Sequence, residues 1–140
     1  MAKIIEVHSE EETRKLSLEF ASGLKDGDII VLNGSLGAGK TFFIREACRY
    51  FDINTVNSPT FALINVYNGK NKIYHFDFYR IEKIEELYDI GFDDYMNDEE
   101  SISFIEWGNL FPEILPEKRI EINILTGIEN NRTFEIRNNK

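Results

Sequence analysis

Residues 28–51 read DIIVLNGSLGAGKTFFIREACRYF, and this stretch decides the fold. It opens with an apolar run over 29–32 bounded by polar residues, which is typical of a strand buried on both faces of a sheet. A glycine-rich turn follows at once, and after it Phe43, Ala47 and Phe51 recur at helical spacing. The order of strand, glycine turn and helix predicts an α/β domain.

The turn itself, GSLGAGKT at 34–41, matches the pattern G-x-x-x-x-G-K-[ST] at every fixed position. Glycines let successive backbone N–H groups converge on a phosphate, and the following helix turns its positive end towards the same anion. Lys40 would add a point charge at the β- and γ-phosphates, and the Thr41 hydroxyl would bind Mg²⁺. The residues therefore predict a nucleotide site of the P-loop type.

Magnesium at such a loop needs a carboxylate from the end of a neighbouring strand. Two strand-like runs end in an acid, since residues 73–76 lead to Asp77 and residues 102–105 lead to Glu106. The sequence leaves open which of the two binds the metal. His75 is assigned to packing within the sheet, and not to a catalytic base, on the expectation that it lies out of phase with Asp77.

The identity of the nucleotide follows from what the chain lacks. A guanine site would need a loop of the N-K-x-D type, but Asn71-Lys72 is followed by Ile73 and Tyr74. We therefore expect ATP. The 140 residues also leave little room for the lid and substrate subdomains of many small-molecule kinases.

The rest of the chain is predicted to alternate strands with helices and to add two hairpins. Ser9 begins a helix capping box directly after a short strand at 3–7. Asn68-Gly69 predicts one antiparallel hairpin, and a second is predicted around Gly127. We expect residues 1–140 to form a single three-layer α/β domain of the P-loop NTPase type. Its mixed sheet would be parallel near the glycine loop and antiparallel at an edge.

Composition limits the functions that the chain can have. Sixteen Lys and Arg residues stand against 25 Asp and Glu residues, which gives a formal net charge of −9. This charge argues against unaided binding of a nucleic-acid backbone, because such binding depends on Lys and Arg displacing counterions. Cys48 is the only cysteine, and no Cys or His cluster has zinc-site spacing. Because no apolar run has the length of a signal peptide or membrane span, we expect a cytoplasmic protein without membrane contact.

Four segments together resemble the TsaE (YjeE) family, the small P-loop ATPases of bacterial tRNA threonylcarbamoyladenosine synthesis. They are LGAGKT at 36–41, SPTF at 58–61, HFDFYR at 75–80 and IEWG at 105–108. A glycine loop alone indicates only a superfamily, whereas four segments in this order and spacing are much more specific. The resemblance covers nearly the whole chain.

The resemblance implies roles for individual residues. Lys40, Asp77 and Glu106 would form the catalytic set, with Thr41 and Glu106 binding Mg²⁺ and Asp77 acting near the γ-phosphate. Ser9 and Thr13 would lie near the base, although helix capping alone would also explain Ser9. The residues expected to contact the nucleotide are Ser9, Thr13, Gly34, Leu36, Gly37, Ala38, Gly39, Lys40, Thr41, Phe42 and Arg132.

Two further parts of the chain are expected to act outside the nucleotide contacts. The resemblance implies that the loop of Ser58, Pro59 and Thr60 is a switch over the nucleotide. Trp107 follows Glu106 directly, and the sequence leaves open whether it packs in the core or contacts a partner or substrate.

By the same resemblance, the protein does not modify tRNA itself. TsaD with TsaB would transfer the threonylcarbamoyl group to the adenosine beside the anticodon, and a TsaE protein would bind that complex and hydrolyse ATP. The tRNA would be reached only through the complex. Two alternatives stay open, a nucleotide-dependent binding module with incidental hydrolysis and a small-molecule kinase.

Overall fold

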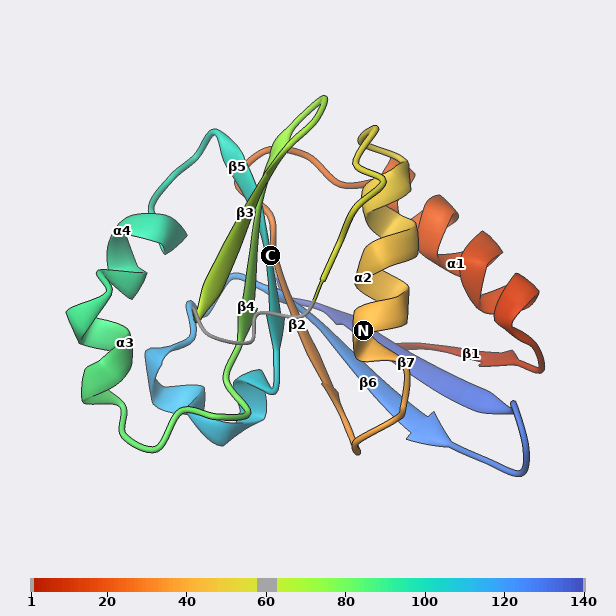
Figure 1. Ribbon diagram of the computed structural model, residues 1–140. Helices are drawn as coiled ribbons and strands as arrows, with labels where there is room; N and C mark the ends of the chain where they lie inside the picture. The colour runs from red at the N-terminus through yellow and green to blue at the C-terminus, as the bar shows by residue number, and fades with distance from the viewer. Residues whose placement is uncertain (1, 58–62, 140) are drawn as a thin grey trace.

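The computed structural model describes residues 2–57 and 63–139, which form a seven-stranded sheet with helices on both faces (Figure 1). The strands are β1 (Ala2–Val7), β2 (Ile29–Gly34), β3 (Ile64–Asn68), β4 (Lys72–Asp77), β5 (Ser101–Glu106), β6 (Ile120–Thr126) and β7 (Arg132–Asn138). The helices are α1 (Glu10–Ser22), α2 (Lys40–Arg49), α3 (Glu85–Asp89) and α4 (Phe92–Met96), with 3-10 turns η1 (Gly108–Leu110) and η2 (Pro112–Ile114). Within the described residues, no helix has the length and apolar composition needed to cross a membrane.

The sheet is parallel in its middle and antiparallel at both edges. Its strand order is β1-β7-β6-β2-β5-β4-β3. Strand β2 is parallel to both of its neighbours, β5 and β6, and β4 is parallel to β5. The pairs β3–β4, β6–β7 and β1–β7 are antiparallel. Both predicted hairpins and the predicted mixed sheet are therefore confirmed, and the pairing of β1 with β7 adds a second antiparallel edge.

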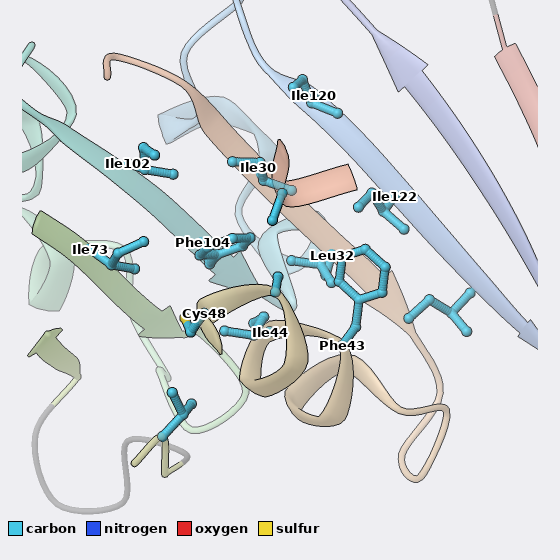
Figure 2. Close-up of a cluster of buried hydrophobic side chains, with 14 of the residues drawn as sticks. Ile30, Leu32, Phe43, Ile44, Cys48, Ile73, Ile102, Phe104, Ile120 and Ile122 are labelled. Carbon is cyan, nitrogen blue, oxygen red and sulfur yellow. The ribbon is translucent and has the colours of Figure 1, made fainter. Parts of the chain in front are cut away.

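Two apolar cores lie on opposite faces of the sheet, as expected for three layers. Strand β2 contributes to both, because Ile30 and Leu32 pack towards α1 and α2, whereas Val31 packs towards α3 and α4. Figure 2 shows Ile30 and Leu32 beside Phe43 and Ile44 of α2. The run predicted to be buried on both faces is thus the central strand of the sheet.

The two helices on one face are joined by ion pairs of a buried carboxylate with two partly exposed arginines. Glu46 of α2 is 2% exposed, and its carboxylate accepts hydrogen bonds from Arg14 Nε of α1 at 2.8 Å and from Arg49 Nε at 3.2 Å. Burial by itself would raise the pKa of Glu46, but the two guanidinium groups hold it below its ordinary value. These ion pairs therefore hold α1 against α2, whose first residues belong to the glycine loop.

The carboxyl ends of the parallel strands β2, β5 and β4 lie side by side at one end of the sheet. In the strand register, Leu32 of β2 lies beside Glu106 of β5, and Glu106 lies beside Asp77 of β4. After β2 the chain enters the glycine loop and then α2. The sheet thus places both acids beside the loop, which is where open parallel sheets bind their ligands.

Close packing of η1 on β2 predicts the effect of a small substitution. A Cβ atom at Gly108 would lie 2.4 Å from Val31 Cγ1, a buried side chain that cannot move aside easily. We expect Gly108→Ala to lower the free energy of unfolding by about 1–3 kcal/mol, measured by urea denaturation. The control is Gly23→Ala, where the nearest atom is Phe20 O at 3.7 Å and φ is −94°. That change should be neutral or slightly stabilising, and equal losses in both variants would contradict the tight approach.

Candidate nucleotide site

The glycine loop has a backbone conformation that only its glycines adopt easily. Gly37 and Gly39 have φ values of +79° and +106°, where a side chain would be strained. Gly39 is also the N-cap of α2 and makes no side-chain cap hydrogen bond. The first turn of α2 therefore offers its N–H groups to an external anion instead of to a capping side chain.

Lys40 lies beneath this loop with its ammonium group buried. It is 5% exposed, and Nζ donates to Gly34 O at 2.6 Å and to Ser35 O at 2.9 Å. Nζ also lies 4.1 Å from the centroid of the Trp107 ring. Burial lowers the pKa of Lys40, while the nearby carboxylates of Glu106 and Asp77 act in the opposite direction. A phosphate at the loop would offer this cation a charged acceptor in place of the two carbonyl oxygens.

Thr41 and Glu106 form the part of the site that suits a metal. Thr41 Oγ1 lies 2.9 Å from Glu106 Oε1 and 3.0 Å from Oε2, and Glu106 is 3% exposed. Within the described residues, no cluster of three or more His, Cys, Asp or Glu side chains could hold a metal alone. Magnesium usually takes one or two protein oxygens together with phosphate oxygens and water. The donor set therefore fits a magnesium ion bound with a nucleotide better than an independent metal site.

Asp77 lies next to Glu106 but makes a different contact. Its Oδ1 accepts a hydrogen bond from the backbone N–H of Tyr79 at 2.9 Å. Burial raises the pKa of Asp77, and the negative charge of Glu106 adds to that rise. Of the two acids that the sequence left open, Glu106 is the one in contact with Thr41.

A cavity of about 390 Å³ lies over these groups. Its lining residues are Leu36, Gly37, Gly39, Lys40, Thr41, Phe42, Asp77, Tyr79, Arg80, Glu106 and Trp107. The predicted metal ligands, Thr41 and Glu106, therefore share one space with the other two members of the predicted catalytic set, Lys40 and Asp77. Tyr79 and Arg80 also line it, and the sequence analysis gave neither of them a role.

Trp107 lines this cavity and also packs against the apolar core of the α3 and α4 face. It is half-buried, with a left-handed backbone at φ +61°. Its ring packs on Tyr79 with centroids 4.9 Å apart, on the side of the site that also holds Lys40. Packing on the core is therefore observed together with a position at the cavity, and a contact of Trp107 with a partner or substrate stays a prediction.

A second cavity of about 190 Å³ lies on the other side of the start of α2. Its lining residues are Ser9, Glu10, Thr13, Ala38, Gly39, Phe42, Asn130, Arg132 and Phe134. Gly39 and Phe42 line both cavities, so the two spaces adjoin at the end of the loop. Arg132 Nε of β7 donates to Ala38 O at 3.1 Å, which ties the last hairpin to the glycine loop.

Ser9 has the capping role that its spacing predicts. Its hydroxyl accepts a hydrogen bond from Glu12 N at 3.1 Å, and Thr13 Oγ1 donates to Ser9 O at 3.2 Å. A contact of Ser9, Thr13 or Arg132 with a nucleotide stays a prediction, although all three line the second cavity. Ser58, Pro59 and Thr60, the predicted switch loop, lie outside the described residues.

The sequence analysis missed a contact of His75 with Glu106. His75 is completely buried, and its Nε2 lies 2.6 Å from Glu106 Oε2. Its assignment to packing rested on a phase relative to Asp77, and that phase was wrong. Residues two apart on a strand point to the same face, so His75 and Asp77 share the face that carries Glu106. The spacing in the sequence contained the signal.

Comparisons with known proteins place this geometry in a family. Residues 7–134 match the profile of the family described as threonylcarbamoyl adenosine biosynthesis protein TsaE. The tRNA threonylcarbamoyladenosine biosynthesis protein TsaE of Rickettsia conorii is 43% identical over 129 residues, 90% of this chain and 72% of that protein. The protein of the same name from Bacillus subtilis is 40% identical over 116 residues, 81% of this chain and 72% of that protein.

A solved structure shows the same fold. The crystal structure of Bacillus subtilis YdiB matches with a TM-score of 0.81 and 27% sequence identity, covering 100% of this chain and 87% of that chain. The predicted class, an α/β fold of the P-loop type with a mixed sheet, is confirmed.

The contact between Thr41 and Glu106 predicts a metal-specific loss of nucleotide affinity. Thr41→Ala and Glu106→Gln should each weaken ATP binding about tenfold or more in Mg²⁺, because each removes a proposed metal ligand, but only about twofold in EDTA. Isothermal titration in the two buffers measures both values. Thr126→Ala, which lines neither cavity, is the control. Equal losses with and without Mg²⁺ would assign Glu106 to structure alone.

Proposed function

The chain belongs to the TsaE family, and from this premise we propose that it is a Mg²⁺-dependent ATPase that supports threonylcarbamoylation of tRNA. One observation carries the proposal of an ATPase. Thr41 at the start of α2 and Glu106 at the end of β5 meet at 2.9 Å beside a glycine loop that holds a buried lysine. A cation, a hydroxyl and a carboxylate in this order are what a magnesium nucleotide needs.

Lys40, Glu106 and Asp77 in the first cavity then have different tasks. Loop N–H groups and Lys40 bind and orient the phosphates. Thr41 and Glu106 hold Mg²⁺, which when bound neutralises charge that develops on the phosphates. Asp77 orients the attacking water and accepts its proton. Burial raises the pKa of Asp77, and this direction makes a carboxylate a stronger base than it is in water.

The second cavity is the proposed position of the nucleoside. With its phosphates at the loop, the nucleotide could extend into either of the two cavities that meet at Gly39. The first cavity already contains the metal ligands and the acids, which leaves the second for the nucleoside. The second cavity offers Ser9, Thr13 and Arg132 as polar groups around Phe42 and Phe134. An apolar wall with few polar groups is typical of a site for a purine base. Adenine remains the proposed base.

We propose TsaD and TsaB as the partners, with tRNA reached only through them. The family relationship and the net charge of −9 support this division, because an acidic protein is suited to a basic partner surface and not to a phosphate backbone. Leu36 and Tyr79 are 66% and 46% exposed at the rim of the first cavity. A docked partner would cover these side chains and could sense the nucleotide state. The proposed location is the cytoplasm, and the proposed unit is a single domain.

The proposed role of Asp77 predicts a variant that binds ATP but hydrolyses it slowly. Asp77→Asn should bind ATP within a few-fold of wild type, while hydrolysis falls by roughly 10²-fold or more because the proton acceptor is gone. The melting temperature at pH 7 should stay equal or rise, because the ionised carboxylate is disfavoured by burial and by Glu106. Unchanged turnover with a lower melting temperature would make Asp77 a structural residue.

The proposed partners predict a coupled increase in two activities. Adding TsaD with TsaB should raise steady-state ATP hydrolysis, and repeated rounds of tRNA modification should require it. Lys40→Ala is the control and should lose both activities, because the loop then offers only N–H dipoles to the phosphates. Full modification with a non-hydrolysable ATP analogue would instead indicate a nucleotide-dependent binding module. Transfer of phosphate to a small molecule in a phosphoacceptor screen would indicate a kinase.

A further inference from the structure

A continuous line of polar side chains runs beneath the site across four elements. Thr41 of α2 contacts Glu106 of β5, whose Oε2 lies 2.6 Å from His75 Nε2 of β4. His75 Nδ1 lies 3.1 Å from the hydroxyl of Tyr67 on β3. All of these side chains lie on the sheet face that packs against α2, and the line ends at the proposed metal ligands.

The chemistry of Glu106 fixes which nitrogen of His75 carries a hydrogen towards it. A carboxylate that binds a metal ion can only accept hydrogen bonds, so a Glu106 that serves as a metal ligand requires Nε2 to be the donor. Thr41 Oγ1 of α2 lies within hydrogen-bond distance of both oxygens of the same carboxylate, at 2.9 Å and 3.0 Å. Glu106 is thus held by two side chains, which fixes the orientation of its carboxylate relative to α2.

Tyr67 is placed to act on the other nitrogen of the same ring. In the structure its hydroxyl donates to Asn57 O at 2.9 Å and accepts from Asn65 Nδ2 at 3.3 Å. The same hydroxyl lies 3.1 Å from His75 Nδ1, within reach of that nitrogen if its hydrogen turns away from Asn57 O. Asn57 O also accepts from Asn65 Nδ2 at 2.8 Å, so this carbonyl keeps a donor when Tyr67 turns to His75. Burial raises the pKa of Tyr67, so the hydroxyl stays a donor at neutral pH. Donation to Nδ1 selects the tautomer in which Nε2 carries the hydrogen.

Packing alone does not explain this arrangement. Ile73, two residues before His75 on the same face, and Ile102 of β5 are completely buried and apolar. His75 is therefore a polar residue on an otherwise apolar part of this sheet face, and it lies within hydrogen-bond distance of Glu106. His75 lines neither cavity, so it cannot touch a nucleotide there and could act only through Glu106.

We propose that His75 and Tyr67 are positioning residues of the magnesium site, with His75 donating to Glu106 and Tyr67 fixing the tautomer of His75. The inference rests on the proposed function, because it assigns Glu106 to the metal. Groups that hydrogen-bond a metal ligand typically change metal affinity or activity by 10–100-fold when removed. The effect should therefore appear in metal-dependent binding and not only in stability.

The experiment measures the Kd of ATP in Mg²⁺ and in EDTA for the wild type and for variants of His75 and Tyr67. His75→Leu should weaken binding in Mg²⁺ by about 10–100-fold and in EDTA by less than about twofold. His75→Gln should recover most of the loss, because its amide can donate to Glu106. Tyr67→Phe should cause a smaller loss, also specific to Mg²⁺, because it leaves His75 in place and frees its tautomer.

A matched control is Tyr74→Phe. This change also removes a tyrosine hydroxyl from the same region, but Tyr74 points to the opposite face of β4 and donates to Asp98 Oδ2 at 2.6 Å. It should change the melting temperature without changing the ratio of the two Kd values. Equal effects of Tyr67→Phe and Tyr74→Phe on that ratio would overturn the inference.

Two further readouts separate positioning from general destabilisation. In the Glu106→Gln background, His75→Leu should cause no further Mg²⁺-specific loss, because the two residues act through one contact. In the nucleotide-free protein, ¹⁵N NMR of the His75 ring should show a hydrogen on Nε2 and none on Nδ1. The opposite tautomer would overturn the inference, and so would additive losses. The NMR result also decides the matter if His75→Leu fails to fold.

The outcomes distinguish this inference from the function on which it rests. A wild-type protein that binds ATP equally well in Mg²⁺ and in EDTA would overturn both. A metal-dependent wild type with His75→Leu unchanged in both buffers would overturn only the positioning role. A Mg²⁺-specific loss that His75→Gln restores would support it.

Discussion

The burial of β2 on both faces and along both edges is the constraint on which the site depends. Its apolar residues face two different cores, so a slip of one residue in register would exchange every side chain between them. Parallel neighbours on both sides fix the same register by hydrogen bonds. The start of the glycine loop therefore has a fixed position along the sheet relative to Glu106, which lies beside Leu32. The contact between Thr41 and Glu106 follows from that position.

Next to this apolar strand the fold buries a cluster of polar and charged side chains. Lys40, His75 and Glu106 are all at most 5% exposed, and burial of such groups is unfavourable unless each has a hydrogen-bond partner. Each one has partners here: loop carbonyls for Lys40, and Thr41 and His75 for Glu106. Further from the site along the same strands, this face carries apolar side chains such as Ile73 and Ile102. A buried polar cluster at the end of an otherwise apolar sheet marks the place where stability was exchanged for function.

The sequence predicted what short-range patterns determine. The loop and helix of the glycine motif, the N-cap at Ser9 and the hairpin at Asn68-Gly69 each depend on a few consecutive residues, and the structure has all three. The return bond of the capping box differs, because the Glu12 side chain accepts from His8 N instead of Ser9 N. The contact of His75 with Glu106 was missed although the spacing to Asp77 contained it. The contact of Tyr67 with His75 could not be predicted, because it depends on the register between β3 and β4.

The positions of Trp107 and Arg132 depend on backbone conformation and on pairing between distant parts of the chain. Trp107 faces the site because its own backbone is left-handed, which is uncommon for a residue other than glycine. No local pattern indicates such a φ value. Arg132 was expected near the nucleotide only by resemblance, since no local sequence pattern around it predicts a contact with the glycine loop. Its bond to Ala38 joins residues 94 positions apart.

The pairing of β1 with β7 brings together two strands that lie outside the four parallel strands β4, β5, β2 and β6. In that register Val7 lies beside Arg132, so the segment entering α1 and the last hairpin arrive at the same place. A side-chain hydrogen bond of 3.0 Å between His8 Nδ1 and Asn131 Oδ1 joins them there. The two cavities thus have different origins. The ends of β4 and β5 supply the acids of the first cavity, whereas the start of α1 and strand β7 supply Ser9 and Arg132 to the second. Strand β7 is therefore needed to complete the second cavity, and its pairing with β1 holds it beside the segment that enters α1.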